Sequence, residues 1–145
     1  MEFNESQLDQ VARDMVMMAP QAAALGFELV SVETGRGVMR VPWREALAGD
    51  PDTAVIAGGV VTTLLDHVCG LAVVSAVREL GTTPTLDLRI DYMRPAAPRS
   101  AITAEAHCYK LTRSIAFVRA QAYDDKGGEP IATAQAAFML GANGR

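Results

Sequence analysis

The stretch GGVVTTLLDHVCGLAVVSAVREL, residues 58–80, constrains the fold of this chain more than any other feature. After its opening glycines it holds no turn residue except Gly70, and it is apolar on nearly every helical face. A helix that is apolar all round must have other elements packed about it. We therefore predict one long central helix over residues 58–80, closed by Gly81 and wrapped by the rest of the chain.

Segments of alternating apolar and polar residues lie on both sides of this helix. Before it, residues 27–33 and 36–42 are joined by Thr34-Gly35, which predicts a hairpin. After it, four further strands are predicted, over residues 85–93, 101–112, 114–124 and 131–140. No strand–helix–strand repeat is present, so a doubly wound parallel sheet is disfavoured. The pattern favours an α+β fold, a curved antiparallel β-sheet wrapped around one long central helix, which is the hotdog fold.

The remaining segments fit the same fold. Residues 6–18 form an amphipathic helical pattern with Ser6 as the expected cap and Pro20 at its end, within an N-terminal helical segment, residues 1–24. Residues 44–57 are expected to be mostly loop. We expect residues 1–145 to form a single hotdog domain, because a chain of 145 residues can bury a core without disulfides or a structural metal.

Charge and composition disfavour several function classes. The formal net charge is −4, and no basic stripe is present that could neutralise nucleic-acid phosphates. Cys69 and Cys108 have no metal-ligand spacing around them, so we expect two buried thiols in a reducing compartment, no metal and no cofactor. The acidic N-terminus lacks a signal-peptide pattern, and the apolar run 68–77 is too short to cross a bilayer. These features predict a cytoplasmic protein that binds neither nucleic acid nor membrane.

Asp66 is the strongest candidate for chemistry. Its neighbours, among them Leu65 and Val68, leave little solvated surface, and an unpaired buried charge costs several kcal/mol. The ordinary alternative is an exposed or hydrogen-bonded Asp with a structural role. A carboxylate held in an apolar helix is the better candidate for a nucleophile or general base.

Gly58 and Gly59 precede the helix and should form its first turn. A helix N-terminus offers unpaired N–H groups and positive potential, which can stabilise an oxyanion. Glycine also lets the backbone approach a carbonyl closely. Most glycine pairs at the start of a helix only relieve crowding. The presence of Asp66 in the same helix strengthens the interpretation that this pair lies in an active site.

Three stretches resemble hotdog acyl-CoA thioesterases of the phenylacetic-acid-degradation (PaaI-like) type. AGGVVTTLLDHVCGLA (57–72) resembles their signature, usually His-Gly-Gly, five variable residues, Leu or a similar residue, and Asp. TLDLRIDYMRPA (85–96) is similar to the strand after their helix, and DDKGGEPIATA (124–134) to their closing segment. The resemblance covers roughly residues 25–140 and implies a hotdog fold, thioester hydrolysis and active sites shared between subunits.

The resemblance also implies residue roles. Asp66 falls where the family places its nucleophile or general base, and Gly58 where a backbone N–H polarises the thioester carbonyl. Thr85 falls on a hydroxyl that helps to position the attacking water. Gly59, in the same turn as Gly58, is expected to contact the substrate.

Two positions depart from the family pattern. Ala57 replaces the usual His before the glycines, and Pro51 replaces an Asn that many members carry six residues earlier. Both missing side chains normally help to orient substrate or water. The departures predict slower turnover or an unusual substrate.

The two histidines argue against a hotdog dehydratase, which needs a convergent His and carboxylate. Asp66 and His67 are adjacent on a helix and point about 100° apart, so they cannot easily serve one substrate atom. We expect His67 to be structural or at an interface. His107 lies on a predicted strand with no companion.

Coenzyme A carries several phosphates, and four cations are candidates to meet them: Arg94, Arg99, Lys110 and Arg113. Arginine suits bidentate phosphate contacts. Surface arginines at strand ends are more often only solvated, and that alternative stays open here.

The leading hypothesis is hydrolysis of an acyl-CoA thioester. A non-hydrolytic hotdog protein that binds an acyl-CoA or a small aromatic ligand is the alternative, because Ala57 and Pro51 depart from the family. Gly58 and Asp66 lie roughly 12 Å apart along a helix, so one helix cannot present both to one carbonyl. We therefore expect a homodimer, or a homotetramer built as a dimer of dimers, in which each site combines Gly58 of one subunit with Asp66 of another.

Overall fold

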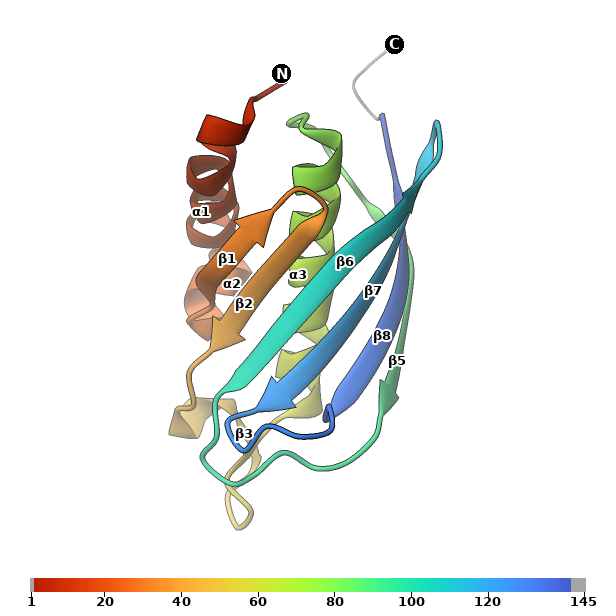
Figure 1. Ribbon diagram of the computed structural model, residues 1–145. Helices are drawn as coiled ribbons and strands as arrows, with labels where there is room; N and C mark the ends of the chain where they lie inside the picture. The colour runs from red at the N-terminus through yellow and green to blue at the C-terminus, as the bar shows by residue number, and fades with distance from the viewer. Residues whose placement is uncertain (1, 142–145) are drawn as a thin grey trace.

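The computed structural model describes residues 2–141, which form a six-stranded antiparallel sheet curved around one long helix (Figure 1). In space the strands follow the order β1-β2-β6-β7-β8-β5. Their bounds are β1 (Glu28–Glu33), β2 (Arg36–Val41), β5 (Thr85–Tyr92), β6 (Ile102–Leu111), β7 (Ile115–Asp124) and β8 (Ala132–Met139). Each strand ends within one residue of its predicted limits. The α+β class and the hotdog architecture are confirmed.

The central helix α3 (Gly58–Val77) lies in the concave side of the sheet, where Leu64, Leu65 and Leu71 are almost completely buried. The sheet faces it with small residues, mainly the inward-pointing alanines of β6, β7 and β8. At Gly37 a Cβ atom would lie 2.9 Å from Cδ2 of Leu71, so this glycine is required by the close approach of helix and strand. The small residues let the sheet curve closely around the helix.

Helix α3 ends three residues earlier than predicted, and Gly81 does not close it. Arg78 takes the left-handed conformation, with φ of 56°, and its N–H donates to the Val74 carbonyl. The Phe3 N–H then donates to the Arg78 carbonyl at 3.0 Å. The N-terminal segment therefore pairs with the chain at the point where the helix would have continued, a contact that local sequence could not indicate.

The N-terminal segment holds a 3-10 turn (Glu5–Gln7) and two helices, α1 (Leu8–Met18) and α2 (Pro20–Leu25). Asn4 caps the first turn in place of Ser6, because its side chain accepts the N–H of Gln7 and the Gln7 side chain accepts the N–H of Asn4. Pro20 does not only end α1, since it also begins α2. Helix α1 packs against β1, and both helices contact α3 (Figure 1).

The segment predicted as loop, residues 44–57, contains a 3-10 turn (Glu45–Leu47) and two short strands, β3 (Ala48–Asp50) and β4 (Val55–Ile56). These strands pair with each other and lead the chain into the first turn of α3. They form no part of the main sheet.

By length and composition α3 would be able to cross a membrane. Most of it is buried inside the fold, so the packing against the sheet accounts for its apolar character.

Candidate active site

One face of α3 is left partly uncovered by the sheet. Gly59, Thr63, Asp66 and Gly70 recur at helical spacing, and none of them is buried. Asp66 is therefore half-buried within one chain. The expectation, from its apolar neighbours, that this side chain is fully buried is wrong for a single chain. The carboxylate lies on the face of α3 that a substrate or a second subunit could reach.

Asp66 and Thr85, to which the family resemblance assigns catalytic roles, lie in contact in the structure. Thr85 is the first residue of β5, and its Oγ1 donates a hydrogen bond of 2.8 Å to Oδ1 of Asp66. No other hydrogen bond to this carboxylate is found within residues 2–141. The hydroxyl fixes the orientation of the carboxylate and keeps its own lone pairs available for a water molecule.

Neither glycine at the start of α3 is crowded by the rest of the protein. A Cβ atom at Gly59 would meet nothing within 4 Å, and one at Gly58 would lie 3.6 Å from the Tyr92 hydroxyl, an ordinary contact. Relief of crowding therefore does not explain either glycine. The first N–H groups of a helix have no intrahelical acceptor, and Ala57 supplies no side-chain cap. This turn can donate to an oxygen atom of a ligand.

Tyr92 joins this turn and was missed by sequence reasoning. The Tyr92 hydroxyl donates to the Gly58 carbonyl at 2.8 Å and lies 2.7 Å from Oγ1 of Thr62. From the sequence alone, Tyr92 is identified only as one of the apolar positions in an alternating strand. No local signal could have linked it to a glycine thirty-four residues away.

Within one chain Gly58 and Asp66 do not meet. They stand on the same straight helix, about 12 Å apart along its axis. Strand β5 runs beside α3 in the opposite direction, so that Thr85 contacts Asp66 and Tyr92 contacts Gly58. The chain thus carries two candidate half-sites, Asp66 with Thr85 and Gly58 with Tyr92, one at each end of β5.

Strand β5 is an edge of the main sheet. It bears exposed Leu86 and Tyr92, and Met93 follows it, also exposed. An edge strand has a row of backbone groups that can pair with another strand. This edge lies next to both half-sites.

The Arg94 side chain is already hydrogen-bonded to other residues of the same chain. Its guanidinium donates two hydrogen bonds to the Asp124 carboxylate, at 2.8 and 3.2 Å, and one of 2.7 Å to the Glu129 carbonyl. The Asp124 side chain is completely buried, and the hydrogen bond from Arg94 lowers its pKa to about 2. A nucleotide phosphate would have to compete with this buried carboxylate for Arg94.

The other predicted cations do not cluster in one chain. Arg99 is exposed, and its guanidinium carbon lies 5.8 Å from the centroid of the Trp43 ring. Lys110 and Arg113 are exposed at the far end of β6 from Arg99. Strand β6 spans ten residues, about 33 Å, between them.

His67 points away from the Asp66 side of the helix. Its Nε2 lies 3.3 Å from the Met15 carbonyl, and its ring meets Phe27 edge to face. Burial lowers the pKa of His67, which favours the neutral ring. These contacts tie α3 to the N-terminal helices and agree with the structural role expected for this residue.

The cysteines are buried and unpaired, as predicted. Burial raises the pKa of Cys69 to about 12, so its thiol is not a nucleophile near neutral pH. Among residues 2–141, no group of three His, Cys, Asp or Glu side chains is placed to hold a metal ion.

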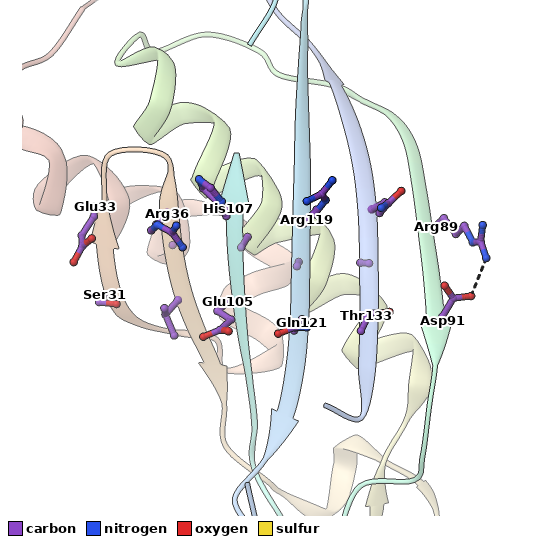
Figure 2. A pocket seen from close by; sticks show the side chains of 16 residues that line it. Ser31, Glu33, Arg36, Arg89, Asp91, Glu105, His107, Arg119, Gln121 and Thr133 are labelled. Carbon is purple, nitrogen blue, oxygen red and sulfur yellow. Dashed lines mark hydrogen bonds and ion pairs between the residues drawn. The ribbon is translucent and has the colours of Figure 1, made fainter. Parts of the chain in front are cut away.

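A hollow of about 600 Å³ lies on the outer face of the sheet, which is the face turned away from α3 (Figure 2). Its charged side chains balance, three of each sign: Arg36, Arg89, Arg119, Glu33, Asp91 and Glu105. His107 also lines this hollow. Because the sheet separates it from Asp66, the hollow is not part of the Asp66 site.

Known proteins resemble this chain over the segment that carries both half-sites. The sequence model of the thioesterase superfamily matches residues 54–131. The medium/long-chain acyl-CoA thioesterase YigI of Escherichia coli is 26% identical over 150 residues, 94% of this chain and 96% of that protein. A putative esterase of Halobacterium salinarum is 31% identical over 94 residues, and this match spans 63% of the chain but only 61% of the esterase.

Solved structures share the fold. A Pseudomonas aeruginosa protein is 36% identical, with a TM-score of 0.84 over 92% of this chain and 99% of its own. The E. coli PaaI protein, from the phenylacetic acid degradation operon, has a TM-score of 0.81 over 92% and 93% of the two chains, at 18% identity. The likeness to PaaI shows a common fold, in agreement with the resemblance seen in the sequence.

Proposed function

Because this chain belongs to the thioesterase superfamily, we propose that it hydrolyses an acyl-CoA thioester to the free acid and CoA. The observation that carries the proposal is the hydrogen bond between Thr85 and Asp66 on the open face of α3. It supplies a carboxylate of fixed orientation beside a hydroxyl that can hold a water. The name of the YigI relative supports acyl-CoA as the substrate class.

In the proposed mechanism the thioester carbonyl accepts a hydrogen bond from the Gly58 N–H. This bond strengthens as negative charge develops on the oxygen, and it lowers the barrier to attack. Asp66 acts in one of two ways: it attacks the carbonyl carbon itself, or it removes a proton from the attacking water. The C–S bond then breaks, and CoA leaves as the thiolate, which takes up a proton.

Thr85 is proposed to hold the attacking water whether Asp66 acts as the nucleophile or as the base. Its proton is committed to Asp66, so its oxygen can accept a hydrogen bond from a water molecule. That water would lie beside the carboxylate, ready for direct attack or for hydrolysis of an acyl-enzyme. The backbone of Gly59, in the first turn of α3, is proposed to contact the substrate.

Each site is proposed to form between two subunits. A carbonyl must lie within about 3 Å of both catalytic groups, whereas α3 separates Gly58 from Asp66 by about 12 Å. Antiparallel pairing of two β5 edges would place Gly58 and Tyr92 of one subunit against Asp66 and Thr85 of the other. The exposed apolar side chains along β5 support such an interface.

The same pairing suggests where the nucleotide would bind. In an antiparallel dimer, Arg99 of one subunit lies at the same end as Arg113 of the other. We propose Arg99 and Arg113 as phosphate contacts. Arg94 is the weaker candidate, because Asp124 already holds its guanidinium.

A non-hydrolytic protein that binds an acyl-CoA or a small aromatic ligand is the second candidate. Ala57 and Pro51 favour it, since both replace groups that orient substrate or water in the resembling family. A free-thiol release assay over a panel of acyl-CoAs separates the two. Release of CoA at a rate proportional to protein supports hydrolysis, and binding without release supports the alternative.

The Asp66→Asn variant tests the catalytic assignment. Asn keeps the shape of the side chain but can act neither as nucleophile nor as base, so kcat should fall by at least about a hundredfold. The matched control is Asp14→Asn, an exposed carboxylate on α1, which should leave kcat unchanged. Near-normal turnover of Asp66→Asn, with the fold retained by circular dichroism, would contradict the assignment.

A further inference from the structure

We propose that Tyr92 is a positioning residue, which holds the first turn of α3 so that its N–H groups face the thioester carbonyl. The inference rests on the proposed function for its catalytic consequence. Its structural basis is a set of hydrogen bonds between the end of β5 and the start of α3.

Three oxygen atoms meet at this turn. The Gly58 carbonyl accepts from the Tyr92 hydroxyl at 2.8 Å and from Oγ1 of Thr62 at 3.0 Å. The two hydroxyl oxygens lie 2.7 Å apart. The two hydroxyl groups have one proton each for these three contacts. Whichever hydroxyl donates to the other, at least one of Tyr92 and Thr62 donates to the Gly58 carbonyl.

The bond to the Gly58 carbonyl sets the direction of the neighbouring N–H groups. The Gly58 carbonyl and the Gly59 N–H belong to one planar peptide unit, so fixing the oxygen fixes that N–H on the opposite side. The same bond opposes rotation about the backbone of Gly58, which has no side chain to restrict it. The N-cap residue Ala57 gives no side-chain hydrogen bond, and the bonds from Thr62 to the Gly58 carbonyl and from Thr63 to the Gly59 carbonyl both come from within α3, so Tyr92 holds the turn from outside the helix.

Tyr92 is placed to affect turnover more than stability. The Tyr92→Phe change keeps the ring, which is 53% exposed within one chain, and removes only the hydroxyl, so it costs little buried surface. Strand β5 contacts both proposed catalytic groups, at Asp66 through Thr85 and at Gly58 through Tyr92. One rigid strand therefore sets the positions of the carboxylate and of the N–H donors.

Removal of the hydroxyl tests the proposal kinetically. Tyr92→Phe should lower kcat about tenfold and leave KM within about twofold, because the N–H donors matter most in the transition state. Thr62→Val should act in the same direction, the double variant should be little worse than Tyr92→Phe alone, and Thr62→Ser should restore turnover. Tyr109→Phe on the outer face of the sheet is the control for the same chemical change and should be normal.

Amide signals of the turn give a readout that does not need activity. In protein labelled with nitrogen-15 glycine, Tyr92→Phe should shift the Gly58 and Gly59 signals and speed their hydrogen exchange. Gly70 and Gly127 should not change. Unchanged Gly58 and Gly59 signals would overturn the proposal, and so would altered signals with normal kcat. If the wild-type protein hydrolyses no acyl-CoA, the proposed function fails, and the amide signals still decide whether Tyr92 holds this turn.

Discussion

Ala57 occupies the position at which the resemblance places a histidine, and the structure shows what surrounds it. A Cβ atom added at Gly49 would lie 3.1 Å from the Ala57 Cα, so β3 passes directly behind this residue. Ala57 itself is half-exposed at the N-terminus of α3. Strand β3 is therefore close beside the Ala57 Cβ, and a larger side chain at position 57 has to extend away from Gly49.

Restoring the histidine is the first residue-scale prediction. Ala57→His should raise kcat/KM about tenfold, or about 1.4 kcal/mol of transition-state stabilisation, if the imidazole only orients substrate. Steady-state kinetics over the acyl-CoA panel measure the change. An unchanged or lower value, in a variant of normal melting temperature, would indicate a pocket built for a different substrate or task.

At this scale the sequence indicates part of the site. The contact between Thr85 and Asp66 could be anticipated, because the family resemblance covers both positions. Tyr92 could not, because its role depends on a hydroxyl meeting a backbone carbonyl, and backbone carbonyls leave no trace in a sequence. The half-exposure of Asp66 was missed because apolar neighbours along a helix do not reveal which of its faces the sheet covers.

At the scale of elements, periodicity predicts the strands well and the helix ends poorly. The alternation in the strands reflects one buried and one exposed face, and this pattern is present in each strand from β6 to β8. The end of α3 at Val77 depends on the pairing of Phe3 with Arg78, which is distant in sequence. The cap at Asn4 depends on the reciprocal bonds with Gln7, which compete with the plausible cap at Ser6.

A buried ion pair fixes the loop after β5, and its acid sensitivity is the prediction at this scale. Asp124 has a pKa of about 2 in the folded protein, below its ordinary 3.8, because Arg94 stabilises the charged form. Its contribution to stability is therefore complete above about pH 4 and is lost as pH falls toward pH 2. Asp124→Asn should lower the melting temperature near neutral pH and flatten the loss of stability across that window.

Asp125→Asn is the matched control for this prediction. Asp125 pairs with Arg40 at 3.1 Å, but both side chains are well exposed, and such pairs contribute little. Thermal unfolding followed from neutral pH to about pH 2 compares the two variants. Equal pH dependence of Asp124→Asn and wild type would show that the Arg94–Asp124 pair does not control acid stability.

At the scale of the whole molecule, one chain contains the parts of the proposed site but does not assemble them. Asp66 with Thr85 and Gly58 with Tyr92 form separate half-sites on α3 and β5. The two proposed phosphate contacts, Arg99 and Arg113, likewise lie at opposite ends of β6. An antiparallel pairing of two β5 edges would bring the two half-sites together, and it would place Arg99 of one chain at the same end of the joined sheet as Arg113 of the other.

The nucleotide contacts can be tested with a shortened substrate. Arg99→Ala and Arg113→Ala should raise KM for acyl-CoA but not for the corresponding acyl-pantetheine, which lacks the nucleotide phosphates. Arg13→Ala is a control at an exposed arginine whose partner, Asp9, lies on the same helix. Equal increases in KM for both substrates would remove Arg99 and Arg113 from the nucleotide site.

Mixing two inactive variants tests the shared site most directly. Asp66→Asn lacks the carboxylate, and Gly58→Pro lacks the N–H at a helix position where proline is tolerated. Each variant alone should be inactive and folded. When the two are unfolded and refolded together, half of the dimers should be mixed, and each mixed dimer regains one complete site.

The predicted result is recovery of about a quarter of wild-type thiol release, appearing only after subunit exchange. Native mass spectrometry with one isotopically labelled variant would count the mixed dimers in the same sample. Activity should rise in proportion to that count. A mixture that stays inactive while mixed dimers are present would contradict the shared site.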